Sequence, residues 1–173
     1  MISIDYMADY IEKNNQFKDN SDLWKTIQTV MNCSVKQAKQ YATTHCNSFS
    51  FYCCLFACEF ISMTYEEFFM WGKKTGAVNK YGFVEWEKDK ILDELCPGVI
   101  IKKYTVNSFL HEGVYQIKIV NSHGTHFMFG YFTVKDGLLI YDTNNRGIGV
   151  RAKENLHRDD TIVWLKEFVR KEA

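Results

Sequence analysis

The chain has 173 residues, and its 21 basic side chains balance 21 acidic ones, so its formal net charge at pH 7 is zero. A neutral chain without clusters of lysine and arginine has no bulk attraction for nucleic acid or for an anionic membrane surface. Hydrophobic residues make up 46% and aromatic residues 16%, which excludes an intrinsically disordered chain. We expect one domain over residues 1–173, with a helical half at 1–98 and a sheet half at 99–173.

We expect no signal peptide, because mixed polar residues follow the first few positions. No stretch approaches the ~20 consecutive apolar residues that a membrane-spanning helix needs. Six cysteines without a secretion signal predict free thiols in a reducing compartment. We therefore expect a cytoplasmic protein, with release by lysis of a host cell left open and the oligomeric state undetermined.

The first half of the chain is predicted to be helical, because its apolar residues recur at helical spacing. Ser21 and Ser34 are placed to cap the second and third helices, and Thr64 with Glu67 fits a capping box. The most apolar helix is expected to have Asn47 or Ser48 near its cap. The predicted helices cover residues 5–14, 21–31, 34–42, 47–62, 64–74 and 85–95.

The second half is predicted to form strands. Apolar residues alternate along 114–120, and the strands at 125–134 and 138–142 flank Asp136-Gly137, a sequence typical of a hairpin turn. Further strands are expected at 99–104 and 161–168. Helices followed by an antiparallel sheet predict an α+β fold.

A cysteine and a histidine occur in an order that suits nucleophilic catalysis. Cys46 lies where a loop gives way to the most apolar helix, and the unpaired N–H groups of a helix start stabilise a thiolate. His126, near the start of a predicted strand, is a candidate acceptor for the thiol proton. Gln40 is a candidate donor to an oxyanion, together with the backbone N–H of Cys46.

The hairpin register decides which side chain orients His126. A loop of two or four residues places Asn145 on the face of His126, whereas a loop of three or five residues places Asp142 and Asn144 there. We expect Asp142 to orient the imidazole. Asn144 is the alternative, because an uncharged side chain also fixes the tautomer.

In their order and spacing these residues resemble the papain-like cysteine peptidase superfamily. Gln40 and Cys46 match its oxyanion glutamine and its nucleophile, and residues 126–131 and 138–142 look like its histidine strand and the strand that ends in the third triad member. Within the superfamily the chain is most similar to the peptidases that trim double-glycine leaders from bacteriocins, and to their stand-alone bacterial and phage relatives. The resemblance covers residues 40–145 and implies a papain-like fold, with N-terminal helices packed on a C-terminal antiparallel sheet.

The resemblance implies hydrolysis of an amide bond, in a peptide or a peptidoglycan stem, by acyl transfer through Cys46. No cofactor is expected. Transfer of the acyl group to an amine other than water, as in transglutaminase-like relatives, is a further possibility. The rival interpretation is a papain-like module that binds a partner without catalysis, because Asn47 and Ser48 follow the cysteine where the family often has glycine.

Structural zinc is an alternative use of the cysteines and histidines. Cys54 and Cys58 share a helix face, and His123 lies close to His126 in the sequence. No Cys-x-x-Cys pair is present, so we expect no metal site. Free cysteines in apolar surroundings are most often buried as small hydrophobic residues. We expect this of Cys53, Cys54, Cys58 and Cys96.

Overall fold

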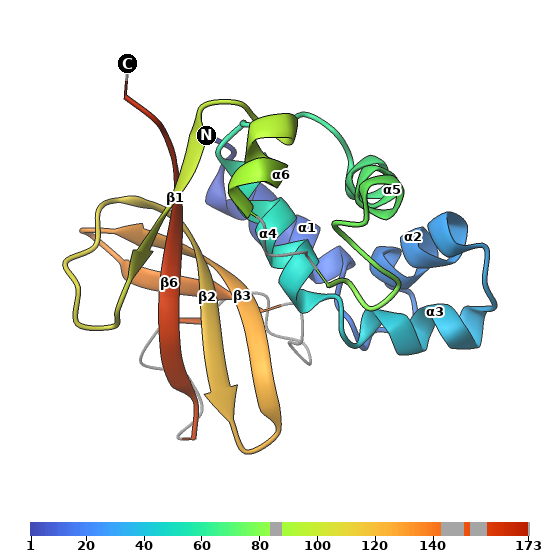
Figure 1. The fold of residues 1–173 in the computed structure, drawn as a ribbon. Coiled ribbons are helices and arrows are strands. Elements are labelled where there is room, and N and C mark those ends of the chain that lie inside the picture. Colours follow the sequence, from blue (N-terminus) through green and yellow to red (C-terminus); the bar gives the residue numbers. More distant parts are fainter. Residues whose placement is uncertain (84–87, 143–150, 153–158, 173) are drawn as a thin grey trace.

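The structure is a computed structural model that describes residues 1–83, 88–142, 151–152 and 159–172. Within these ranges the helices belong to the N-terminal half and the strands to the C-terminal half, which confirms the predicted α+β class. Figure 1 shows the helices gathered on one side of a single antiparallel sheet.

Serine hydroxyls cap the first three helices by accepting a hydrogen bond from a backbone N–H group of the first turn. The pairs are Ser3 with α1 (Ile4–Lys13), Ser21 with α2 (Asp22–Met31) and Ser34 with α3 (Val35–Ala42). The caps at Ser21 and Ser34 are those that the sequence predicts.

Helix α4 (Cys46–Ala57) is the centre of the molecule, and almost all of its residues are buried. It ends earlier than the predicted residue 62, because Glu59 adopts a left-handed conformation with φ 59°. The N–H groups of Glu59 and Phe60 then bond to the carbonyls of Phe56 and Leu55, at 2.9 and 3.0 Å. This pattern is a Schellman motif, which closes a helix at its C-terminus.

Two further helices complete the helical half. Helix α5 (Tyr65–Thr75) has the predicted capping box, in which Thr64 and Glu67 bond to each other's backbone N–H groups. It ends at Gly76, whose φ of 80° suits glycine. Helix α6 (Lys88–Leu95) lies next to the first strand.

The sheet has six described strands in the order β1-β6-β2-β3-β4-β5, and every neighbouring pair is antiparallel. The predicted strands form, including the one at 161–168, whereas the two-residue strand β5 is not predicted. The strands are β1 (Val99–Tyr104), β2 (Gly113–Asn121), β3 (Gly124–Thr133), β4 (Gly137–Tyr141), β5 (Arg151–Ala152) and β6 (Thr161–Arg170).

Helix α4 packs on β2 and β3 and joins the helical half to the sheet. Aromatic rings dominate this main core; for example, Phe51 of α4 meets Phe168 of β6 edge to face at 5.2 Å between ring centroids. A second cluster of buried apolar side chains includes Ile117, Met128 and Leu165 of the sheet. Among the described residues, no helix has both the length and the apolar composition that a membrane crossing needs.

Candidate active site

Cys46 is the first residue of α4, one residue before the predicted start. The preceding residue, His45, is the N-cap, but its side chain makes no capping hydrogen bond. The predicted cap residues Asn47 and Ser48 lie inside the first turn instead. The positive end of the helix dipole therefore acts directly on Cys46, which is 8% exposed.

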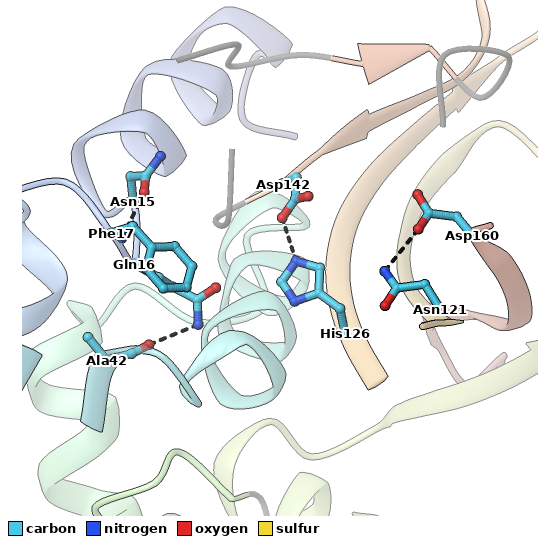
Figure 2. Close-up of polar contacts among 8 residues, drawn as sticks. All are labelled: Asn15, Gln16, Phe17, Ala42, Asn121, His126, Asp142 and Asp160. Atoms are coloured by element: carbon cyan, nitrogen blue, oxygen red, sulfur yellow. Dashed lines mark hydrogen bonds and ion pairs between the residues drawn. The ribbon is translucent and has the colours of Figure 1, made fainter. Parts of the chain in front are cut away.

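His126 of β3 and Asp142, which follows β4, form a partly buried ion pair. Nε2 of the imidazole hydrogen-bonds Oδ1 of the carboxylate, and the two side chains are 13% and 8% exposed. Figure 2 shows the ring directed toward this carboxylate. The carboxylate fixes which ring nitrogen faces it, and therefore how the other nitrogen is presented.

The register of the β3–β4 hairpin brings this pair together. Phe129 lies opposite Tyr141 and Thr133 opposite Gly137, so three residues connect the paired strands. When the number of connecting residues is odd, Asp142 and His126 lie on the same face of the sheet.

The imidazole of His126 interacts with Cys46 as well as with Asp142. Burial of the ring lowers its pKa, but the hydrogen bonds and charges of Asp142 and Cys46 outweigh burial and raise the pKa to about 10. Because Nε2 of the ring hydrogen-bonds Asp142, Nδ1 is the ring nitrogen that is available to Cys46. The three side chains thus form a chain of contacts that holds His126 in its protonated form at neutral pH.

Gln40 and Asn144 are the two remaining candidate residues. Gln40 is an exposed residue of the last turn of α3, and its backbone carbonyl accepts hydrogen bonds from the N–H and hydroxyl of Thr43. Asn144 lies outside the described residues. The oxyanion role of Gln40 and the alternative role of Asn144 remain predictions.

Gln116 of β2 is a supporting residue that the sequence does not reveal. Its fully buried Nε2 donates to the backbone carbonyl of Asn47, to Oδ1 of Asn47 and to Oγ of Ser50, at 3.1, 3.2 and 2.9 Å. It ties the first turn of α4 to the sheet that carries His126. The available signal was weak, because Gln116 alternates with apolar residues in the same way as Lys118 does.

His45 anchors the start of α4 from the other side. Its Nε2 donates to the carbonyl of Lys80 at 2.8 Å, which leaves Nδ1 to accept from the hydroxyl of Tyr65 at 2.9 Å. The Tyr65 hydroxyl also bonds to Ser48 Oγ at 2.8 Å. Complete burial lowers the pKa of His45 to about 4, although the bond to Lys80 opposes the shift. His45 is therefore a neutral structural residue and not a second base.

The chain before α4 is held in place by Gln16. Its Nε2 donates to the carbonyl of Ala42 at 2.8 Å, and the backbone N–H of His45 bonds to the same carbonyl at 3.1 Å. Figure 2 shows Gln16 and Ala42 in the same region as His126 and Asp142. The turn that presents Cys46 is thus fixed by a residue far away in the sequence.

The residues of the alternative zinc site are used differently. Cys54 is buried in α4, Cys58 is half-buried rather than buried as predicted, and His123 is exposed. His126 is engaged by Asp142. The part of the chain that the structure describes contains no group of three or more His, Cys, Asp or Glu side chains arranged to hold a metal ion.

Comparison of the chain with protein-family models, with curated proteins and with solved structures gave no match.

Proposed function

We propose that this chain is a cysteine hydrolase with a papain-like fold, which cleaves an amide bond by acyl transfer. One observation carries the proposal: the imidazole of His126 contacts both Cys46 and Asp142 at the N-terminus of a buried helix. A thiol, a base and a residue that orients the base are the parts that nucleophilic catalysis by cysteine needs.

In the acylation step, the sulfur of Cys46 attacks the carbonyl carbon of the substrate. The proton that His126 holds passes to the leaving nitrogen as the C–N bond breaks, and a thioester remains on Cys46. In the second step His126 takes a proton from water, which attacks the thioester and releases a carboxylic acid and the free enzyme. Asp142 keeps the ring oriented through both steps.

The negative charge on the carbonyl oxygen needs donors in the transition state. The backbone N–H of Cys46 belongs to the first turn of α4, where N–H groups have no partner within the helix. Gln40 is the proposed second donor on the strength of its spacing. Its exposed side chain has to turn toward Cys46 when substrate binds.

The proposed substrate is a peptide or a peptidoglycan stem. The mechanism requires no cofactor, and the balanced charge of the chain gives no reason to propose nucleic acid as a partner. We propose a cytoplasmic location, with release by lysis as the route to an external substrate.

Alkylation by iodoacetamide near neutral pH tests the proposal, with each cysteine followed by peptide mass spectrometry. We expect Cys46 to react at least about tenfold faster than the other cysteines, and His126→Ala to remove that advantage, because the thiolate is the reactive form. Equal slow labelling of Cys46 and the other cysteines, unaffected by His126→Ala, would contradict it.

The other cysteines of the core provide internal controls. Burial raises the pKa of Cys58 to about 12 and that of Cys96 to about 11, and it raises the pKa of Cys53 and Cys54 well above the ordinary value. These thiols stay protonated near neutral pH. Cys33 is half-buried, and a Cys33→Ser background removes the one thiol besides Cys46 that is not among these four.

The second candidate is a binding module in which the triad is inactive. The low exposure of Cys46 favours this candidate, since it restricts access to the sulfur, and so does the presence of Asn47 and Ser48 where the resembled family often has glycine. Slow labelling of Cys46 would support it. Product analysis with an added amine separates hydrolysis from acyl transfer to that amine.

A further inference from the structure

The loop at 79–83 lies directly against the residue that precedes Cys46. The carbonyl of Lys80 accepts the hydrogen bond from His45, and Gly82 packs on the His45 backbone. A Cβ atom at Gly82 would lie 2.6 Å from Cα of His45 and 2.8 Å from Oγ of Ser48. The loop is therefore a fixed border of the start of α4.

The loop carries Lys80 and Tyr81, and both lie against Tyr41 of α3. Tyr81 meets Tyr41 edge to face, with ring centroids 5.6 Å apart and an angle of 87° between the rings. The Nζ atom of Lys80 lies 5.5 Å from the ring centroid of Tyr41 and 5.2 Å from that of Tyr81. Tyr81 is 49% exposed, and Lys80 is also exposed, so both are accessible to a ligand.

Tyr41 reaches the same place from the end of α3. Its carbonyl accepts hydrogen bonds from the backbone N–H and the hydroxyl of Thr44, at 3.1 and 3.0 Å, in the turn that leads to Cys46. Tyr41, Lys80 and Tyr81 therefore form one cluster. The Tyr41 carbonyl bonds to Thr44 and the Lys80 carbonyl to His45, so both parts of the cluster are tied to the residues that precede Cys46. We call these three residues the Lys80 cluster.

The chemistry of the Lys80 cluster suits a carboxylate. An ammonium group above aromatic rings is held by their negative faces, and it still has N–H donors for a further partner. Among the described residues, no carboxylate forms an ion pair with Lys80. The positive end of the α4 dipole adds to the same field.

We propose that the Lys80 cluster is a substrate subsite, which selects amides that carry a carboxylate group near the bond to be cleaved. Lys80 binds the carboxylate by a charge-assisted hydrogen bond, and the rings of Tyr41 and Tyr81 pack on the adjacent aliphatic carbons. The proposal rests on the proposed function of Cys46, and it specifies the substrate as acidic on one side of the scissile amide.

Two chloroacetyl dipeptide amides that differ only in glutamate or glutamine test the selection. Both alkylate Cys46 by the same chemistry, so the ratio of their second-order labelling rates reports recognition of the carboxylate. We expect the glutamate probe to react about five to ten times faster with the unchanged protein. Lys80→Gln should bring the ratio close to one, and Lys80→Glu should reverse it.

Matched variants separate recognition of the carboxylate by Lys80 from the general effect of removing one positive charge from the protein. Lys103→Gln removes an exposed lysine from β1 and should leave the ratio unchanged. Tyr81→Leu should slow both peptide probes by a similar factor, because the aromatic surface that packs on their aliphatic carbons is lost. A ratio near one in the unchanged protein, or an equal loss in Lys80→Gln and Lys103→Gln, would overturn the subsite.

The two proposals fail in different ways. If iodoacetamide labels Cys46 rapidly and His126→Ala abolishes this, but the probes are not distinguished, only the subsite is wrong. If labelling by iodoacetamide is slow and independent of His126, the hydrolase proposal is wrong. Calorimetric binding of unreactive acetyl-glutamate and acetyl-glutamine amides then tests the Lys80 cluster alone. Equal affinity for the two amides would reject it.

Discussion

At the scale of one residue, His126 shows how neighbouring side chains can reverse the effect of burial on the pKa of an imidazole. An imidazole taken out of water ordinarily loses its proton, so burial alone lowers its pKa. Here Asp142 and Cys46 both stabilise the charged ring, and the pKa rises from 6.5 to about 10. His45, which is completely buried and bonded to neutral groups, moves the other way, to about 4. Charged or ionisable neighbours therefore decide whether a histidine taken out of water keeps its proton.

The raised pKa of His126 predicts how stability depends on pH. The folded state holds a proton that the unfolded chain releases above pH 6.5, so the stabilisation is complete below 6.5 and is lost as the pH rises toward the folded pKa. In a Cys46→Ser background, which removes the thiol from the site, Asp142 still raises this pKa. The free energy of unfolding should fall above pH 6.5, by up to about 1.4 kcal/mol per pH unit.

Urea unfolding at a series of pH values measures this dependence. The matched control is Cys46→Ser with His126→Gln, whose free energy of unfolding should lack the same decrease. Parallel curves for the two proteins would mean that His126 is not held in its protonated form.

At the scale of single elements, the start of α4 is set by tertiary contacts. The sequence offers Asn47 and Ser48 as caps, yet the helix begins at Cys46 without a side-chain cap. Bonds from His45 to Lys80 and from Gln116 to Asn47 hold the first turn instead. Such contacts join residues far apart in the sequence, so a local capping rule cannot predict them.

Gly76 and Gly82 have similar backbone conformations but different surroundings. Substituting each one separates the cost of backbone strain from the cost of a steric clash. Gly82 (φ 72°) lies against His45, whereas Gly76 (φ 80°) has no atom within 4 Å of an added Cβ. Gly76→Ala should cost about 1 kcal/mol, the strain of a left-handed alanine. Gly82→Ala should cost about 1–3 kcal/mol more, because the loop has to leave the start of α4.

Thermal unfolding of the two variants measures this difference, and the labelling rate of Cys46 reports its effect on the site. We expect slower labelling in Gly82→Ala and an unchanged rate in Gly76→Ala. Equal destabilisation by the two substitutions would show that the loop does not hold the start of α4.

The hairpin between β3 and β4 shows which part of the site the sequence could not decide. Its pattern predicts both strands, but a change of one residue in the connection moves every side chain of a strand to the other face. The structure has three connecting residues, with the backbone N–H of Asp136 bonded to Oγ1 of Thr133 at 3.0 Å and Gly137 at φ 70°. This connection, and not the strand pattern, places Asp142 beside His126.

For the whole molecule, local patterns predict the elements, and long-range contacts decide the details of the site. Apolar spacing and serine caps predict the helices because both are local properties. The pairing of β1 with β6, the support from Gln116 and the anchoring of His45 depend on how distant segments meet. For the same reason, the spacing of six residues predicts that Gln40 lies beside Cys46, although the side chain of Gln40 is exposed in the structure.

The packing of α4 on β2 and β3 carries the central claim of the account. It joins the helix that begins with Cys46 to the strand that carries His126, whose pKa is raised by its contacts with Asp142 and Cys46. The most direct test is the ultraviolet absorbance of the thiolate near neutral pH, taken as the difference between the unchanged protein and Cys46→Ser. The account predicts a thiolate band that disappears in His126→Gln. Absence of the band at neutral pH, or its persistence without His126, would contradict the account.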